Sequence, residues 1–479
     1  MRLTLGEVSG ATGGEILDGD PELTLGSVSV DSRRMEPGAL FVALRAERDG
    51  HDFAAAAATA GAIAVLVERP LPELPAGTAA VLVMDTGTAL AALGAHVRDR
   101  LGDAVPVVGI TGSTGKTSTK DLTAAALGAR LAVSASPASW NNEIGVPLTL
   151  VGTDETAGAV VLEMGARGQG HIAALCAVAR PTIGVITTIG IAHAEFFGTT
   201  DDVARAKGEL VEALPAGGTA ILNADEDTTP DLAARSAAPV LTAGSTPAAD
   251  VRFSDVTLDD ELRPSFRLET PWGGADVGPL PVRGAHQAMN AAFAVAVAGV
   301  LGLSPEAAAE GMAEAVGSAW RMELTRTPGG LLVLNDAYNA NPSSMRAALH
   351  ALAALGSGRR FAVLGHMAEL GEQSDSYHHL IGRQAASTLL RMLVVVGREA
   401  AGIAEAARAG GVDVVEVDSP DEALAVLAGE VRPGDAVLVK ASRVVGLERL
   451  AAALSAPDFG DTPNPPDFGD TPNPGGAPA

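Results

Sequence analysis

Short apolar runs rich in β-branched residues recur along this chain and alternate with helix-favouring stretches. Between residues 105 and 320 they are VPVVGIT, AVVLEMG, TIGVITTIG and GTAILNADE, and from residue 321 they restart with LLVLNDAYN, RRFAVLGH, MLVVVG, VDVVEV and DAVLVKAS. Strands that alternate with helices in this way favour a parallel sheet covered by helices. The pattern therefore predicts an α/β protein with two such sheets in succession.

The length of 479 residues exceeds what one hydrophobic core supports, so we expect several domains. Residues 1–100 mix short strands with an Ala-rich helix and predict a mixed α/β N-terminal domain. Residues 101–320 predict a central P-loop ATPase-like domain with a parallel sheet, and residues 249–283 within it alternate polar and apolar residues as a small antiparallel insertion would. Residues 321–455 predict a C-terminal Rossmann-like domain. Residues 456–479 repeat PDFGDTPNP and predict a disordered tail rich in Pro, Gly and Asp.

Composition limits the partners of the chain. The formal net charge is −25, which disfavours binding to nucleic acid or to anionic lipid. The apolar run AAFAVAVAGVLGL (291–303) is shorter than a membrane span and predicts a buried helix instead. The first residues do not read as a signal peptide, and one cysteine, Cys176, fits a reducing compartment. We therefore expect a cytoplasmic protein without membrane insertion. The sequence does not give the oligomeric state, and a monomer is the default expectation.

The stretch GITGSTGKTSTKDL (109–122) lies where a strand should turn into a helix. It matches the second half of the phosphate-loop pattern G-x-x-x-x-G-K-[ST], but Ile110 stands where the first glycine is expected. A glycine-rich turn at a helix N-terminus still presents N–H groups and a favourable dipole to an anion. We therefore predict a nucleoside triphosphate site, with a glycine-rich turn and a solvated lysine as the alternative. The predicted nucleotide-binding residues of the turn are Gly112, Ser113, Thr114, Gly115, Lys116, Thr117 and Ser118.

Polar residues at strand ends provide further candidates. Glu163 closes the run AVVLEMG at the sheet edge that also carries the glycine-rich turn, where a carboxylate can hold Mg²⁺. His193 follows another strand, but a lone histidine there is more often a surface or hydrogen-bonded residue. Lys207 lies in a helical stretch and by itself would be a solvated lysine. The residues alone predict an ATP site with Mg²⁺ and do not identify the acceptor.

A dozen motifs occur in order along residues 1–455. They are VSVDSRRMEPGALFVAL, DGHDF, GITGSTGKTSTKD, NNEIGVPLTL, LEMGARGQGHI, IGIAHAEFFGTTDDVARAKGEL, NADE, GAHQAMNAAFA, WRMEL, NDAYNANPSSM, VLGHMAELGEQSDSYHHLIG and KASRVVGLERL. In this order they resemble the Mur ligase family of ATP-dependent amide-forming enzymes. DAYNANPSSM and MAELGE resemble the members that add D-alanyl-D-alanine to UDP-N-acetylmuramoyl-tripeptide. The resemblance implies a peptidoglycan-precursor ligase that works through an acyl phosphate.

The resemblance also implies roles around the nucleotide. Two Mg²⁺ ions are expected, one held by Thr117 and Glu163 and the other by Glu163, His193 and a carbamylated Lys207. Asn290 is expected near the base, Arg321 at the terminal phosphate, and Asp336 and Asn339 along the nucleotide pocket. Arg321 beside Trp320 is open to a purely structural interpretation. The implied catalytic residues are Lys116, Glu163, His193, Lys207 and Arg321.

Substrate-binding roles follow from the same resemblance. The N-terminal domain is expected to hold the UDP end of the nucleotide-sugar peptide, although Asp31 and Ser32 could form a plain turn. Lys440, Ser442 and Arg443 follow the strand AVLVK and are expected to help place the dipeptide. The full predicted substrate-binding set is Ser32, Arg33, His51, Asp52, Asn142, Lys440, Ser442 and Arg443.

Three positions depart from the family pattern. Ser139 stands where an Asn is common, His366 replaces an acidic residue, and Ala441 replaces a glycine. None of them removes a predicted metal or phosphate ligand. Two alternatives remain open: a folylpolyglutamate synthase, which should lack DAYNANP and DSRxxxPG, and a phosphate-loop switch protein that forms no amide bond. The sequence does not distinguish lysine from diaminopimelate as the third residue of the tripeptide.

Overall fold

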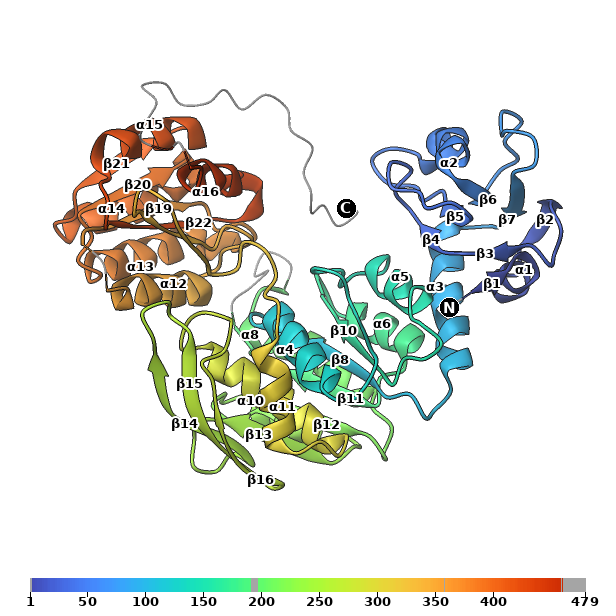
Figure 1. Ribbon diagram of the computed structural model, residues 1–479, viewed down its shortest axis with the longest axis horizontal. Helices are drawn as coiled ribbons and strands as arrows, with labels where there is room; N and C mark the ends of the chain where they lie inside the picture. The colour runs from blue at the N-terminus through green and yellow to red at the C-terminus, as the bar shows by residue number, and fades with distance from the viewer. Residues whose placement is uncertain (1, 191–196, 357, 458, 460–479) are drawn as a thin grey trace.

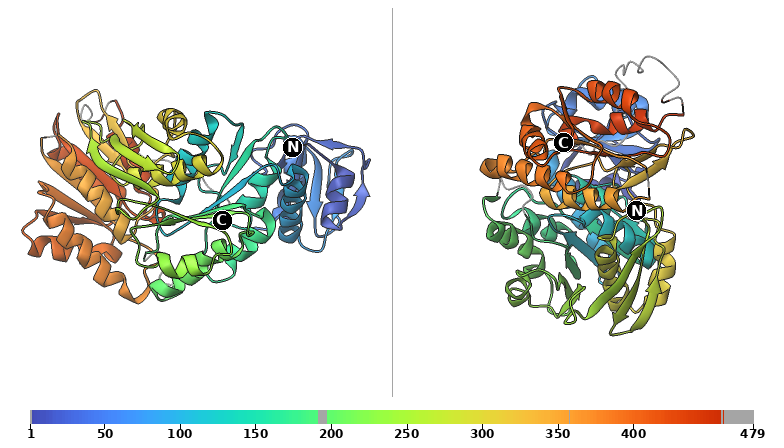
Figure 2. Two further views of the ribbon diagram at one scale, coloured as in Figure 1. Left: turned by 90° about the horizontal axis from the view of Figure 1, so that it is seen from below. Right: turned by 90° about the vertical axis from the view of Figure 1, so that its left-hand side faces the viewer.

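A computed structural model describes residues 2–190, 197–356, 358–457 and 459. Within them the chain forms three α/β units that follow one another along an elongated molecule (Figures 1 and 2). The predicted fold class is confirmed. His193 and all but three residues of the predicted tail lie outside the described residues.

The N-terminal unit is built on a mostly parallel sheet in the order β2-β7-β6-β5-β4, with β2 antiparallel at one edge, and a two-stranded pair β1-β3 beside it. Its elements are β1 Leu3–Thr4, α1 Leu5–Thr12, β2 Glu15–Asp18, β3 Thr24–Leu25, β4 Val28–Ser29, β5 Ala39–Val42, η1 Gly50–Phe53, α2 Ala54–Ala60, β6 Ala62–Val67, β7 Ala79–Leu82 and α3 Thr86–Leu101.

Helix α3 joins this unit to the central one. The helix packs on α1 on one side and on α5 and α6 of the central unit on the other (Figure 1). A Cβ at Gly94 would lie 2.9 Å from the Cα of Pro147, so the absent side chain allows the close approach of α5. Apolar residues of both units share one buried cluster, which makes α3 a packed connection rather than a free tether.

The central unit contains a nine-stranded sheet in the order β16-β15-β14-β13-β12-β11-β8-β10-β9. Its elements are β8 Val107–Thr111, α4 Lys116–Gly128, β9 Val133–Ala135, α5 Gly145–Val151, β10 Ala159–Glu163, α6 His171–Ala179, β11 Ile183–Ile186, α8 Thr200–Glu212, β12 Thr219–Asn223, α9 Thr229–Ala234, β13 Val240–Gly244, β14 Val251–Leu258, β15 Pro264–Thr270, β16 Gly273–Val277, α10 Gln287–Val300 and α11 Pro305–Ala313. The apolar run 291–303 falls mainly in α10, whose residues 290–299 are buried, as predicted.

The predicted antiparallel segment is present and extends the central sheet. Strand β14 pairs in parallel with β13, and β15 and β16 then continue the sheet in antiparallel fashion. The segment therefore covers the hydrogen-bonding edge that β13 would otherwise expose.

Both faces of the central sheet are buried. In β8, Val107 belongs to the apolar cluster under α3, α5, α6 and α8, whereas Val108 and Ile110 belong to the cluster under α4, α10 and α11. Successive strand residues point to opposite faces, so a strand covered on both sides reads as one continuous apolar run. This explains the unbroken VPVV and AVVL runs of the sequence.

The C-terminal unit has a six-stranded sheet in the order β17-β18-β22-β19-β20-β21, parallel except for β17 at one edge. Its elements are β17 Glu323–Arg326, β18 Leu332–Asn335, α12 Pro342–Ala354, β19 Arg360–Gly365, η2 Gly371–Gln373, α13 Ser374–Ala386, β20 Met392–Val396, η3 Arg398–Ala400, α14 Ala401–Ala409, β21 Val414–Val417, α15 Pro420–Glu430, β22 Ala436–Lys440, η4 Arg443–Val445 and α16 Leu447–Leu454. Across the described ranges, every helix is too short or too polar to cross a bilayer.

Candidate active site

The turn between β8 and α4, residues 112–115, continues into Lys116 and Thr117 at the start of the helix, and we call residues 112–117 the phosphate loop after the sequence prediction. Gly112 has a φ of 147°, and a Cβ there would lie 1.9 Å from Oγ1 of Thr187, so the turn requires glycine. The Ser113 N–H donates to the carbonyl of Thr188 at 2.8 Å, which ties the turn to the loop after β11. No side chain caps the start of α4 at Gly115, and the first N–H groups of a helix lack partners within it, which is the arrangement that favours an anion.

Lys116 begins α4 and folds back over the phosphate loop. Its Nζ donates to the carbonyl of Gly112 at 2.7 Å. Burial lowers the pKa of this ammonium, the Glu163 carboxylate opposes that shift, and the charge of Arg321 adds to it. The lysine thus lies at the turn, in contact with the backbone of the turn itself.

Glu163 ends β10, the strand next to β8, and its side chain is 1% exposed. Its Oε2 accepts the Thr117 hydroxyl at 2.7 Å, and its Oε1 accepts Nδ2 of Asn141 at 2.8 Å. The structure thus brings together the two predicted ligands of one Mg²⁺ ion. It also shows a contact of Asn141, whereas the sequence analysis named only its neighbour Asn142.

Asn142, the predicted substrate-binding residue of that pair, has a local role. Its Oδ1 accepts the Gly145 N–H at 2.8 Å at the start of α5. In this structure the side chain closes a turn.

Lys207 lies inside α8 and is 1% exposed, so it is not the solvated lysine that its helix alone would predict. Burial, together with the nearby charge of Lys116, lowers the pKa of its amine well below the ordinary value. Among the described residues its ammonium has no hydrogen-bond or ion-pair partner. The described ranges also contain no group of three or more His, Cys, Asp or Glu side chains placed to hold a metal.

Arg321 reaches the phosphate loop from the linker between α11 and β17. Its Nη2 donates to Oγ of Ser139 at 3.2 Å, and that hydroxyl lies 3.3 Å from Oγ1 of Thr117. Its guanidinium stacks on the ring of Tyr338 at 4.2 Å, and its Nε is buried without a partner within the described chain. The departure at Ser139 is therefore located at the contact between two predicted site residues.

Asn290 lies against the phosphate loop, although we expected it near the base. A Cβ at Gly115 would be 2.7 Å from its Oδ1, which also accepts the Thr119 hydroxyl at 3.2 Å. Its Nδ2 donates to Oε1 of Gln287 at 2.8 Å. Both ends of the amide are thus held by protein groups beneath the turn.

The carboxyl edge of the C-terminal sheet holds a buried ion pair. Lys440 is 1% exposed, and its Nζ lies 2.6 Å from Oδ2 of Asp336 and 2.8 Å from the carbonyl of Asn339. Oδ1 of Asp336 accepts the Met322 N–H at 3.1 Å. Lys440, predicted to place the dipeptide, therefore holds the Asp336–Asn339 segment through protein contacts.

Residues after β22 continue this edge. Oγ of Ser442 accepts the Ala368 N–H at 2.9 Å, and the Arg443 guanidinium stacks on Trp320 at 4.7 Å. The two remaining departures lie here. Ala441 is fully buried, and the His366 ring stacks on His378 with its Nδ1 buried and unpaired among the described residues.

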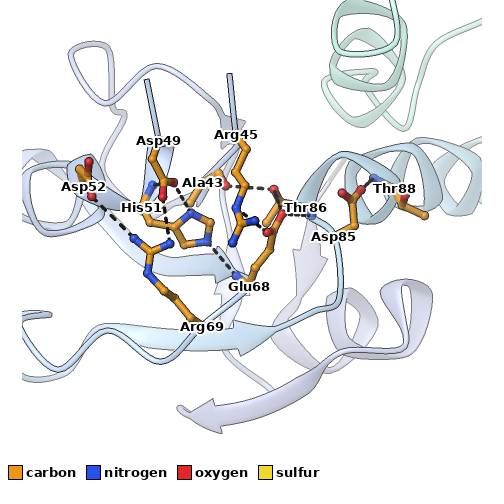
Figure 3. A network of polar contacts seen from close by, with 10 residues as sticks. All are labelled: Ala43, Arg45, Asp49, His51, Asp52, Glu68, Arg69, Asp85, Thr86 and Thr88. Carbon is orange, nitrogen blue, oxygen red and sulfur yellow. Dashed lines mark hydrogen bonds and ion pairs between the residues drawn. The ribbon is translucent and has the colours of Figure 1, made fainter. Parts of the chain in front are cut away.

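The N-terminal unit lies apart from β8 and α4 (Figure 1), and its predicted residues His51 and Asp52 belong to the polar network of Figure 3. The His51 ring is buried, with Nδ1 2.6 Å from Oδ1 of Asp49 and Nε2 accepting the Glu68 N–H at 2.8 Å. Hydrogen bonds from the backbone and ring of His51 hold the pKa of the Asp49 carboxyl below its usual range, with a further contribution from Arg69. Both ring nitrogens are occupied, so His51 organises the loop that carries the exposed Asp52.

Ser32 and Arg33 lie in an exposed turn of the same unit. Oδ1 of Asp31 accepts the Arg33 N–H at 3.0 Å and its Nε at 2.8 Å. The turn geometry considered as an alternative is therefore present, and the Arg33 side chain remains largely exposed.

The fold and the phosphate loop at residues 112–117 define a three-domain phosphate-loop protein, with an α/β domain on each side of the central one. Three family models match it: "Mur ligase family, catalytic domain" over residues 24–98, "Mur ligase middle domain" over residues 110–298, and "Mur ligase, glutamate ligase domain" over residues 320–443. The chain belongs to the Mur ligase family.

Individual relatives match nearly the whole chain. The UDP-N-acetylmuramoyl-tripeptide–D-alanyl-D-alanine ligase of Mycobacterium tuberculosis is 41% identical, and the alignment covers 96% of this chain and 98% of that protein. A crystal structure of MurF from Acinetobacter baumannii is similar with a TM-score of 0.85 and 32% identity, covering 95% and 99% of the two chains. MurF from Thermotoga maritima, solved in complex with ADP, has a TM-score of 0.75 and 29% identity, covering 89% and 96%.

Proposed function

We propose that this chain is an ATP-dependent ligase that joins D-alanyl-D-alanine to UDP-N-acetylmuramoyl-tripeptide, giving the pentapeptide precursor of peptidoglycan, ADP and phosphate. The observation that carries the proposal is the similarity, over 96% of the chain, to the Mycobacterium tuberculosis relative named as a UDP-N-acetylmuramoyl-tripeptide–D-alanyl-D-alanine ligase. The geometry adds support for the nucleotide-dependent half of the reaction, because a phosphate loop, a strand-end carboxylate and an arginine from the next domain meet at one place.

Two cations are proposed to bind the phosphates of ATP. Among the described residues, Nζ of Lys116 hydrogen-bonds to carbonyls of its own loop, which phosphate oxygens could replace. Arg321 comes from the linker to the third unit, and its buried Nε has no partner in the part of the chain that the structure describes. Asp336 and Asn339 remain candidates for the far side of the nucleotide, and the ADP complex of the Thermotoga maritima relative supports a nucleotide in this fold.

The residues at the strand ends fit a hard cation. Thr117 Oγ1 and Glu163 Oε2 face each other at 2.7 Å, and hydroxyl and carboxylate oxygens are the donors that Mg²⁺ prefers. They would hold one ion, and Glu163, His193 and a carbamylated Lys207 would hold a second. When bound, Mg²⁺ would supply charge neutralisation at the phosphate oxygens.

Carbamylation of Lys207 is supported by its surroundings. A buried ammonium beside Lys116 is unfavourable, because two like charges lie near each other away from water. Addition of CO₂ to the amine would replace that cation by an anionic oxygen donor, which Lys116 would then attract. The modification therefore suits both the metal site and the local charge.

The reaction needs no nucleophilic side chain. The terminal carboxylate of the tripeptide attacks the γ-phosphorus of ATP, the bond to the bridging oxygen breaks, ADP leaves, and an acyl phosphate forms. The amine of D-alanyl-D-alanine then attacks the acyl carbon and phosphate leaves. Lys116 and Arg321 offset the charge on the transferred group, and positioning supplies the rest.

The three units imply domain movement. The nucleotide sugar is proposed to bind the N-terminal unit, ATP the central unit and the dipeptide the carboxyl edge of the C-terminal sheet. Bringing these substrates together requires rigid rotation of the outer units toward the phosphate loop. We expect the protein to act in the cytoplasm, where its soluble substrates are made, and as a monomer.

Phosphate release from Mg-ATP tests the proposal. UDP-N-acetylmuramoyl-tripeptide and D-alanyl-D-alanine are added separately and then together, and the masses of the products are measured by mass spectrometry. Release that requires both, with a product heavier by one dipeptide less water, is expected. Lysine- and diaminopimelate-containing tripeptides are then compared to identify the third residue.

Two variants calibrate the assay. Lys116→Ala should abolish release, whereas Arg130→Ala, at an exposed position just after α4, should retain it. Phosphate release that does not depend on either substrate would refute the proposal and favour a nucleotide switch. Phosphate release that requires a folate and glutamate would favour the folylpolyglutamate synthase alternative.

A further inference from the structure

The chain contains only four lysines among its 33 basic residues. Three of them, Lys116, Lys207 and Lys440, have been described above. The fourth, Lys120, lies one turn after Lys116 on α4 and is 3% exposed. Lys120 is not among the predicted site residues, yet burying an ammonium is costly unless every donor is used.

All donors of Lys120 are engaged. Its Nζ donates to the carbonyls of Ser136 at 2.8 Å and of Ala138 at 3.0 Å, and it lies 2.7 Å from Oδ1 of Asp121. The two carbonyls belong to residues 136–142, which lie in the segment between β9 and α5 and which we call the bridging loop. A compact ammonium can serve these three acceptors from one point, which the planar fork of an arginine does not match.

The bridging loop carries groups that touch the phosphate loop. Ala138 has a φ of 45°, a strained value for a residue other than glycine, so its carbonyl needs an anchor to stay in place. Ser139, the next residue, lies 3.3 Å from the Thr117 hydroxyl and accepts Nη2 of Arg321 at 3.2 Å. The anchored loop thus sets where the arginine meets the phosphate loop.

Asp121 connects the same helix to the linker that carries Arg321. Its Oδ2 accepts the hydroxyl of Ser318 at 2.6 Å, three residues before the arginine. The preceding helix α11 packs directly on α4, since a Cβ at Gly311 would lie 2.4 Å from the carbonyl of Ala125. The contacts therefore close a ring from α4 through the bridging loop, Arg321 and the linker back to α4.

We propose that Lys120 and Asp121 are positioning residues that set Arg321 and Ser139 against the phosphate loop and so couple the linker of the C-terminal unit to the nucleotide site. The inference rests on the proposed ATP-dependent activity and deepens it. In this arrangement, rotation of the C-terminal unit moves Arg321 relative to a loop fixed by Lys120, and the ring defines the position in which phosphoryl transfer is supported.

A double-mutant cycle in the full-length chain tests this coupling. Ser318→Ala removes one hydroxyl at the linker and should lower kcat about tenfold while the KM for ATP changes less than about twofold, because the hydrogen bond reaches a charged carboxylate and fixes geometry. In the Arg321→Lys background the same substitution should have almost no further effect, since it acts through the arginine. Equal losses in both backgrounds would overturn the proposal.

Ser245→Ala is the matched control. Its hydroxyl also donates to an aspartate, Asp225 at 2.9 Å, but at an exposed turn of the central unit. It should leave kcat within about twofold, because exposed contacts contribute little. A loss equal to that of Ser318→Ala would overturn the assignment, because loss of a hydroxyl–aspartate bond would then be harmful at any position.

Hydrogen exchange separates this inference from the ligase proposal. Ser318→Ala, and Lys120→Met where it folds, should speed amide exchange in residues 136–142 and 316–322, with no substrate required. If the variants exchange faster than the wild-type protein but the wild-type protein forms no amide product, the positioning ring would be supported and the ligase proposal would be refuted. Unchanged exchange, in an active or an inactive enzyme, would overturn the ring.

Discussion

The buried pair of Asp336 and Lys440 allows a quantitative prediction. Asp336→Asn keeps the volume of the side chain and removes its charge, leaving the Lys440 ammonium 1% exposed and without an anion 2.6 Å away. Breaking a buried ion pair from one side costs about 3–5 kcal/mol, and we expect a loss of that size in the free energy of unfolding of the C-terminal unit. The corresponding fall in its Tm is on the order of 10 °C.

The pH dependence of this loss has a defined sign. Burial lowers the pKa of Lys440 below its unfolded value, the Asp336 carboxylate opposes the shift, and Arg321 reinforces it. Between the two pKa values the unfolded chain binds more protons than the folded one, so stability rises with pH there. The substitution removes the opposing carboxylate and lowers the native pKa further, so the deficit should shrink as the pH is raised from 7 to 9.

Chemical denaturation followed by hydrogen exchange within residues 321–455 measures both effects. Asp413→Ala is the control, because Asp413 pairs with Arg391 at 3.0 Å with both side chains about half exposed. That variant should lose less than about 1 kcal/mol at any pH. A loss for Asp336→Asn no larger than the control, or a deficit that grows with pH, would refute the reasoning.

Three further predictions concern the other units. Glu163→Gln should lower kcat on the order of 100-fold, because it removes charge where the phosphoryl group is transferred. Calorimetry should show an unchanged affinity for ADP in the absence of Mg²⁺. An unchanged kcat would exclude the carboxylate from the reaction. Lys207→Ala should remove most product formation and regain part of it with added formate or acetate, and wild-type-like turnover would contradict the carbamate assignment. His51→Ala should lower the free energy of unfolding of the N-terminal unit by about 2–3 kcal/mol in urea and should raise the KM for the nucleotide sugar. The buried Glu68 N–H loses its acceptor and the Asp49 carboxylate loses the imidazole, although Asp49 keeps Arg69 and the backbone N–H of residue 51. Unaltered stability would show that this network does not hold the loop.

The strands, the phosphate loop and the buried α10 could be predicted from the sequence because each depends on residues close together along the chain. A strand covered on both faces is an apolar run, and a turn packed against Thr187 requires glycine at position 112. Glu163 could be assigned to the edge that carries Lys116 because parallel strands all end at one edge of the sheet. The class of fold and the location of the nucleotide site therefore follow from local pattern together with one topological rule.

The remaining features depend on which distant segments pack together. Asn141, and not its neighbour Asn142, contacts Glu163. Which of the two faces the carboxylate depends on the path of their loop, which Lys120 of α4 holds in place. Strand β14 joins the central sheet because the edge of β13 is free to pair, which no alternation of polar residues encodes. Lys207 is buried because α8 turns its face inward, whereas its helical stretch alone reads as a solvated surface. The sequence alone determines conformations that depend on residues close together along the chain. The tertiary structure determines which side chains are buried and which distant residues pair, because these depend on surfaces that meet only after the chain has folded.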